Sequence, residues 1–149
     1  MNTDKELLAS EKQAVTATAV STDSIIMSGM TGLSRGRSLR AFAQIEAPLT
    51  GGTATGITVE LIQADNSALT TNVEVLGSTG VVANGAGNIN VAGGRRLVDQ
   101  PMPDVTKPFF GFRYTPATGP YDSGTITAGI VAGTETPVAQ RPPYETNGF

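Results

Sequence analysis

The stretch LRAFAQIEA, residues 39–47, decides the fold because its side chains alternate in character from one residue to the next. The first set consists of Leu39, Ala41, Ala43 and Ile45. The second set, at the positions between them, consists of Arg40, Phe42, Gln44 and Glu46. Successive side chains of a β-strand point to opposite faces, so this period of two predicts a strand that buries the first set. Pro48 is expected to end the strand.

The same alternation recurs on both sides of this segment, between residues that favour turns. In ITVELIQA, residues 57–64, the apolar residues Ile57, Val59 and Leu61 fall on one face. The other predicted strands are AVTATAVS at 14–21, SIIM at 24–27, TNVEVLG at 71–77, RRLV at 95–98, FFGFRYT at 109–115 and GTITAGIVA at 124–132. Asn84 followed by Gly85 is a strong signal for a hairpin turn. About eight short strands separated by turns predict an all-β, single-domain sandwich or jelly roll.

The composition excludes most familiar catalytic chemistry. The chain has 149 residues and contains no cysteine, no histidine and no tryptophan. Thiol nucleophiles, imidazole bases and most zinc sites therefore cannot be built. We expect no catalytic residue, no cofactor and no bound metal.

Carboxylates are the remaining candidates for catalysis. Glu46, Glu60 and Glu74 each fall on an outward face of a predicted strand, and two carboxylates that flank a glycosidic bond can hydrolyse it. Exposed glutamates are more often simply solvated, so we expect no enzyme. The stretch QADNSALTTN, residues 63–72, lacks the glycine and terminal glutamate of a calcium loop and is predicted to be an ordinary turn.

The charges do not favour a nucleic acid or a membrane as partner. The formal net charge is −3, and the arginines occur in scattered pairs such as Arg35 with Arg37 rather than along one element. The charged N-terminus lacks an apolar leader, and no apolar stretch reaches membrane-spanning length. We therefore expect a soluble, unsecreted protein.

Four of the few aromatic residues fall in FFGFRYT. Phe110, Phe112 and Tyr114 share one face of this predicted strand, and Phe109 lies on the other. The rings could form a stacking platform for a sugar or a base, or they could fill the core of the sandwich. We favour the core, because phenylalanine is usually buried and no basic groove accompanies these rings.

Both ends of the chain are predicted to be extended. We divide the chain into an N-terminal arm at 1–12, a sandwich at 13–133 and a tail at 134–149 that contains three prolines. The apolar residues that these segments could offer to a partner are Leu7, Leu8, Tyr144 and Phe149.

The stretch ATGPYDSG, residues 117–124, is predicted to be a tight turn before the last strand. Tyr121 and Asp122 lie at its tip. The turn could be a purely structural corner, or its tip could contact a neighbouring subunit, because binding residues often lie on loops held by a rigid scaffold.

Two runs carry a resemblance to a known family. EKQAVTATAVSTDSI, residues 11–25, and YTPATGPYDSGTITAGIV, residues 114–131, together resemble the capsid cement, or decoration, proteins of tailed bacteriophages of the Bordetella podovirus type. The resemblance implies a jelly-roll β-sandwich, made in the host cytoplasm, that binds the outer surface of an icosahedral head as a homo-oligomer. Its partner would be the major capsid protein, and no catalysis is implied.

The resemblance also directs attention to Arg35 and Arg37, which could meet acidic capsid surface. A dimer or a trimer is expected, because sheet edges need cover and a protein on a symmetry axis is itself symmetric. The alternative function is a lectin-like or receptor-binding sandwich on the virion.

Overall fold

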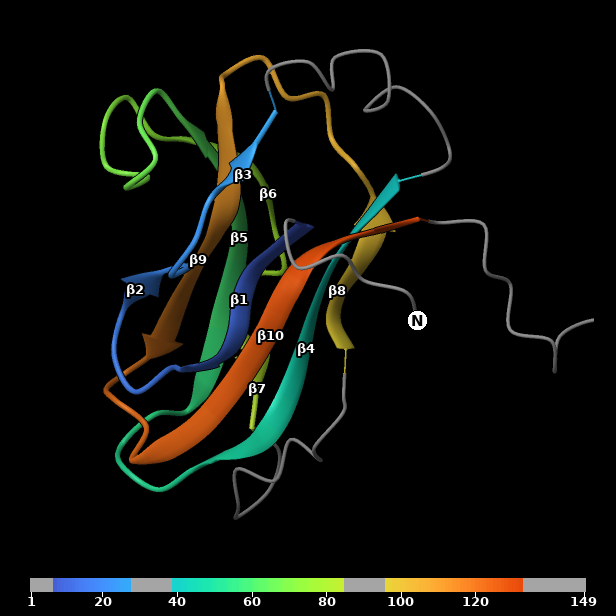
Figure 1. The fold of residues 1–149 in the computed structure, drawn as a ribbon. Helices are drawn as coiled ribbons and strands as arrows, with labels where there is room; N and C mark the ends of the chain where they lie inside the picture. Colours follow the sequence, from blue (N-terminus) through green and yellow to red (C-terminus); the bar gives the residue numbers. More distant parts are fainter. Residues whose placement is uncertain (1–6, 28–38, 85–95, 133–149) are drawn as a thin grey trace, which may run out of the picture.

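The computed structural model describes residues 7–27, 39–84 and 96–132, and these residues form two antiparallel sheets without an α-helix (Figure 1). Sheet A has the order β1, β10, β4, β8, and sheet B has the order β2, β9, β5, β6, with β3 on β9 and β7 on β5. The strands are β1 Leu8–Ala14, β2 Ala19–Val20, β3 Ile25–Ile26, β4 Leu39–Thr50, β5 Gly56–Ala64, β6 Glu74–Ser78, β7 Val82–Ala83, β8 Arg96–Pro101, β9 Phe109–Ala117 and β10 Ser123–Ala132. The predicted all-β sandwich is confirmed.

The ten strands occupy eight strand positions. β2 and β3 pair with successive parts of β9, and β6 and β7 pair with different parts of β5, so each couple is one interrupted strand. If the eight positions are numbered in chain order, sheet A reads 1-8-3-6 and sheet B reads 2-7-4-5. This order is the jelly-roll arrangement of a double sheet.

The core lies between the two sheets and contains the predicted inward faces. Phe110, Phe112 and Tyr114 are completely buried, and the rings of Phe110 and Phe112 meet edge to face with centroids 5.4 Å apart. The prediction that these rings fill the core is therefore confirmed. The other inward residues with at most 1% exposure include Ala41, Ala43, Ile45, Ile57, Val59, Leu61, Ile126, Ala128 and Ile130.

Residues 8–12 do not belong to an N-terminal arm, as was predicted, but to a strand. β1 begins at Leu8 and pairs with β10, so residues 8–12 belong to sheet A instead of an extended arm. The many charges of residues 1–12 favoured an extended arm. In the structure, the buried Ser10 and the half-buried Gln13 of β1 each have a hydrogen-bond partner. The Ser10 hydroxyl is 2.8 Å from the Tyr114 hydroxyl, and the Gln13 amide donates to the Val20 carbonyl at 2.8 Å.

Among the other differences from the predicted strand boundaries, two concern the segment 14–21 and the end of β4. The predicted strand at 14–21 is divided, because β1 ends at Ala14 and the chain crosses to sheet B before β2. β4 continues past Pro48 to Thr50. Pro48 is tolerated because the pairing of β4 with β10 shifts register at this point, and a proline can sit at such a bulge. The tail 134–149 lies outside the described residues.

The buried phenol of Tyr114 predicts a loss of stability in alkali. Burial raises the pKa of Tyr114 above its ordinary value, and the hydrogen bond with Ser10 opposes this only in part. The unfolded chain then releases this proton near pH 10, before the folded chain does, so the unfolding free energy falls above about pH 10. We expect thermal melts between pH 8 and pH 11 to show this fall, and Tyr114→Phe to show a smaller one. Equal slopes for both proteins would contradict the prediction.

Candidate functional site

Three loops of the described residues lie together at one end of the sandwich, which we call the corner end. Its loops are 15–18, 51–55 and 118–122, which connect β1 to β2, β4 to β5 and β9 to β10. All three lie at the lower end of the molecule in Figure 1. The loops 65–73 and 102–108 lie at the other end, which we call the opposite end.

Backbone hydrogen bonds tie the three loops of the corner end together. The amide of Tyr121 donates to the carbonyl of Thr16 at 3.0 Å. The carbonyl of Pro120 accepts from the amides of Thr53 at 3.1 Å and Ala54 at 3.2 Å. Each loop is therefore held by its neighbour as well as by its own strands.

Two glycines allow this close contact. Gly52 has a φ of +66°, and a Cβ atom at this position would lie 2.1 Å from the Pro120 carbonyl oxygen. Gly51 has a φ of +73°, and a Cβ atom there would lie 2.4 Å from a carboxylate oxygen of Asp122. Only glycine combines this left-handed backbone with the absence of a side chain.

The structure places the two residues of the predicted tip differently. Asp122 is exposed, but the ring of Tyr121 is only 2% exposed and belongs to the core. The Tyr121 hydroxyl donates to the Asn84 side-chain oxygen at 2.6 Å, and burial raises the pKa of this phenol. A buried ring cannot supply the exposed contact predicted for Tyr121, and the structural-corner interpretation fits this residue better.

Asn84 follows β7 and bonds to residues of the corner end, a role that the sequence did not indicate. It was predicted only as part of a hairpin turn with Gly85, which lies outside the described residues. Its side-chain amide donates to the Ala54 carbonyl at 2.7 Å, and its backbone amide donates to the Thr55 carbonyl at 3.1 Å. An asparagine before a glycine carried no signal for these long-range contacts.

The other predicted contact residues are distributed as follows. Leu7 and Leu8 are half-buried at the start of β1, and Leu7 packs against the core. Neither side chain is fully exposed, whereas a residue of an extended attachment arm should be exposed before it binds. Arg35, Arg37, Tyr144 and Phe149 lie outside the described residues.

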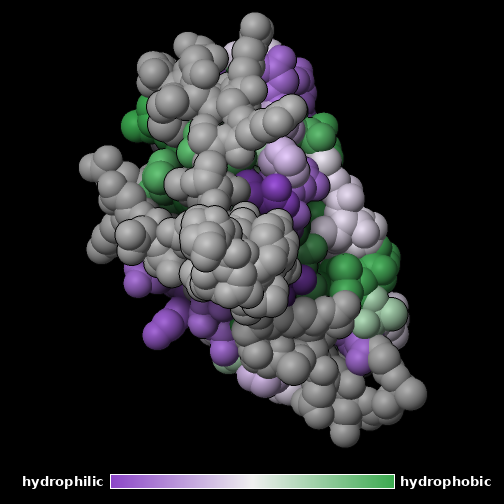
Figure 2. All heavy atoms as spheres, turned by 90° about the vertical axis from the view of Figure 1, so that its right-hand side faces the viewer, coloured by the Kyte–Doolittle hydropathy of each residue, from purple (hydrophilic) through white to green (hydrophobic). Residues whose placement is uncertain are grey.

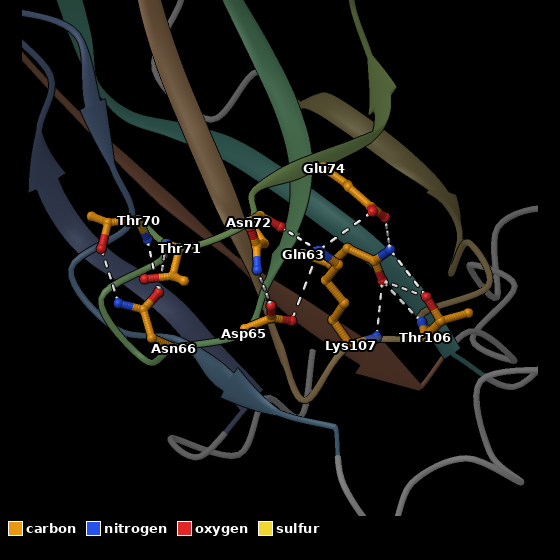
Figure 3. Close-up of polar contacts among 9 residues, drawn as sticks. All are labelled: Gln63, Asp65, Asn66, Thr70, Thr71, Asn72, Glu74, Thr106 and Lys107. Carbon is orange, nitrogen blue, oxygen red and sulfur yellow. Dashed lines mark hydrogen bonds and ion pairs between the residues drawn. The ribbon is translucent and has the colours of Figure 1, made fainter.

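The opposite end carries a polar cluster around Gln63 and Lys107 (Figure 3). The buried side chain of Gln63 accepts from the backbone amides of Thr106 at 2.9 Å and Lys107 at 3.1 Å, and it donates to Glu74 at 2.7 Å. The Lys107 ammonium lies 3.4 Å from Glu74 and 3.8 Å from Asp65. The hydrogen bond from Gln63 does most to hold the pKa of Glu74 below its ordinary value. The hydrogen bond and positive charge of Lys107 lower this pKa further. These contacts fix loop 65–73 to loop 102–108.

The candidate carboxylates do not form a catalytic pair. Glu60 bonds to Arg113 at 2.5 Å, whereas Glu74 pairs in register with Gln63, three residues further along β5 and therefore on the other face. Glu46 is exposed on β4 in sheet A. Among the described residues no three His, Cys, Asp or Glu side chains gather in a way that could hold a metal ion.

Figure 2 shows that the face on the right-hand side of Figure 1 carries both hydrophilic and hydrophobic residues. On β4 and β8, a carboxylate oxygen of Asp99 lies 2.8 Å from the Arg40 side chain, and its other oxygen lies 3.0 Å from the Arg96 side chain. The bond from Arg40 does most to hold the pKa of Asp99 low. Arg96 also lies over the ring of Phe42, 5.7 Å from its centroid, which helps to bury this ring outside the main core.

The described part of the chain contains no helix that is long and apolar enough to cross a membrane. A sequence profile of the family Bbp16 matches residues 9–130, from the second residue of β1 to near the end of β10. None of the curated proteins matches the chain.

Proposed function

Because the chain belongs to the Bbp16 family, a family of Bordetella phage proteins, we propose that it is a capsid cement protein of a phage head. In this role it binds the outer surface of the icosahedral shell and braces neighbouring major capsid proteins. The observation that carries the proposal is the extent of the match, which spans almost the entire sandwich. The jelly roll itself is therefore the unit that this chain shares with the family.

Stabilisation by such a protein follows from mass action. A protein that binds the assembled shell, and not its separate subunits, stabilises the assembled state by RT ln(1 + L/Kd) per site, where L is the concentration of free protein and Kd its dissociation constant. Contacts repeated at symmetry-related sites add avidity when one oligomer touches several subunits. Neither effect requires catalysis.

Co-sedimentation with heads tests the proposal. Purified heads that lack this protein are mixed with the purified chain, and the pellet is analysed for bound protein after centrifugation. We expect saturable binding with a fixed ratio of chain to capsid protein, and increased resistance of the loaded heads to heat. Absence of binding would contradict the proposed function.

A lectin-like or receptor-binding role is the second candidate, because lectin domains also use jelly rolls. Sugar-binding sites usually need exposed rings, but Phe110, Phe112, Tyr114 and Tyr121 are all buried here. A thermal-shift screen with sugars separates the two functions. A cement protein should show no shift, whereas a lectin should show one.

We predict that the free protein is a dimer or a trimer. Sheet A ends at β1 and β8, and among the described strands neither has a second neighbour on its outer side. Such edges are usually covered, and closed symmetric oligomers are the commonest way for soluble chains to associate. Sedimentation equilibrium should give two or three times the chain mass of 15.3 kDa. A single species with the mass of one chain would contradict the prediction.

Arg35 and Arg37 offer an alternative contact with the shell, and this contact predicts that head binding depends on salt. They lie outside the described residues, in a glycine- and serine-rich segment. If they meet acidic capsid surface, affinity should fall as salt rises, because 0.1 M salt screens exposed charges beyond about 10 Å. Replacing both with alanine should flatten the salt dependence measured by co-sedimentation. An unchanged dependence would remove these arginines from the interface.

A further inference from the structure

We propose that the corner end, residues 15–18, 51–55 and 118–122, is the surface that sits on the capsid shell, with a basic side chain of a capsid protein opposite Asp122. This inference rests on the proposed function and deepens it, because it names the surface and the chemistry of its partner. Three features of the described residues support it: low charge, small side chains and a preformed backbone.

The first feature is the almost complete lack of charge at the corner end. Among its described residues Asp122 is the only charged one. The other exposed residues are Thr16, Ala17, Thr18, Gly51, Gly52, Thr53, Thr55, Thr118 and Pro120. Soluble proteins normally mix charges of both signs over their surfaces, whereas the centres of protein interfaces are depleted of charge.

The opposite end has the usual character of a solvated surface. Its two described loops and the start of β6 carry Asp65, Glu74, Asp104 and Lys107. Lys107 lies near both Asp65 and Glu74, so much of this charge is used to hold the loops together. The described residues at the two ends of the sandwich therefore differ in charge. The corner end, with a single charge, is better suited to form an interface from which water is excluded.

The second and third features are the small side chains and the preformed backbone. Both reduce the conformational entropy that is lost when the surface binds a partner. Glycine, alanine, proline and threonine have few rotamers to lose, whereas lysine and glutamate have many. The loops are also already fixed, through the bonds from Tyr121 to Thr16 and from Thr53 to Pro120. A surface that is rigid before binding loses little freedom on contact, so more of the contact energy appears as affinity.

Asp122 determines the chemistry of the partner. Its backbone amide donates to the Thr50 carbonyl at 2.9 Å, which holds its backbone in place, and its carboxylate lies beside Gly51. The side chain is exposed and forms no ion pair with any described residue. A single carboxylate within an otherwise uncharged surface favours a lysine or arginine on the partner and disfavours an acidic residue there.

Two matched pairs of variants test the assignment. Asp122→Lys reverses the charge at the corner end, and Asp104→Lys makes the same change on an exposed residue of the opposite end. Ala17→Lys and Ala68→Lys form the second pair, because both alanines are exposed loop residues at the two different ends. All four changes lie on the surface, and thermal melts confirm that each variant is folded before binding is measured.

We expect Asp122→Lys and Ala17→Lys each to weaken co-sedimentation with heads by at least about tenfold, and Asp104→Lys and Ala68→Lys by less than about twofold. A chain that ends at residue 133 should bind nearly as well as the full chain. If both corner variants bind like the wild type, or if only the truncated chain fails to bind, the assignment of the corner end is wrong while the proposed function stands. If the wild-type chain itself does not bind heads, the proposed function fails and this assignment fails with it.

Discussion

Replacing Phe112 with alanine is expected to lower the free energy of unfolding by about 3–5 kcal/mol, the largest effect of any single change considered for this chain. Phe112 is completely buried between the sheets, and its ring meets Phe110 edge to face. The change removes the transfer free energy of the ring and leaves a cavity that the surrounding β-strands cannot easily close. Small domains are stable by only about 5–15 kcal/mol, so the variant should lose a large part of its stability.

Phe109→Ala is the matched control on the same strand. Phe109 faces away from the main core and is only partly buried, in a small cluster with Ile62, Ala64 and Leu69. The same change there should lower the free energy of unfolding by less than half as much, because less apolar surface is lost. Urea unfolding monitored by circular dichroism measures both values. If both variants lose the same free energy of unfolding, Phe112 does not contribute more to the core than Phe109, and the prediction is wrong.

Gly52→Ala is expected to destabilise the protein by about 3 kcal/mol. Two causes add: a non-glycine residue at a φ of +66° costs about 1–2 kcal/mol, and the new Cβ would meet the Pro120 carbonyl oxygen at 2.1 Å. That carbonyl accepts from Thr53 and Ala54, so moving it weakens two hydrogen bonds of the corner end.

Gly80→Ala separates the two causes. Gly80 has nearly the same φ, +64°, but a Cβ atom there would have no atom within 4 Å. This variant should therefore lose only the backbone contribution, about 1–2 kcal/mol. Thermal and urea unfolding of both variants measure the difference. If Gly80→Ala is as destabilised as Gly52→Ala, contact with Pro120 does not hold the corner end together.

The strands that could be predicted are those in which the side-chain period dominates. β4, β5, β9 and β10 were expected within a few residues of their observed bounds, because apolar residues occupy every second position of each. β1 was missed because its buried Ser10 is polar and Lys12 has a φ of +48°, which interrupts the alternation. The partner of Ser10 is Tyr114, 104 residues further along the chain, so no local pattern could reveal it.

The candidate site was less predictable than the fold. The turn at 117–124 could be identified from its glycines and proline, and the exposure of Asp122 agrees with a tip. The burial of Tyr121 depends on Asn84 and Thr16, which approach it only when the two sheets pack together. The uncharged surface of the corner end likewise comes from three segments that are distant in sequence, and each alone is an ordinary loop.

The pairing of β1 with β10 has a practical consequence for engineering. These strands are antiparallel neighbours, and Leu8 lies opposite Gly129, so the described chain starts and finishes on the side of the sandwich away from the corner end (Figure 1). A passenger peptide joined directly after Ala132, or directly ahead of Leu8, should therefore leave the sandwich on that side. With the corner end seated on a head, such passengers would face the medium, and the protein would serve as a platform for multivalent display.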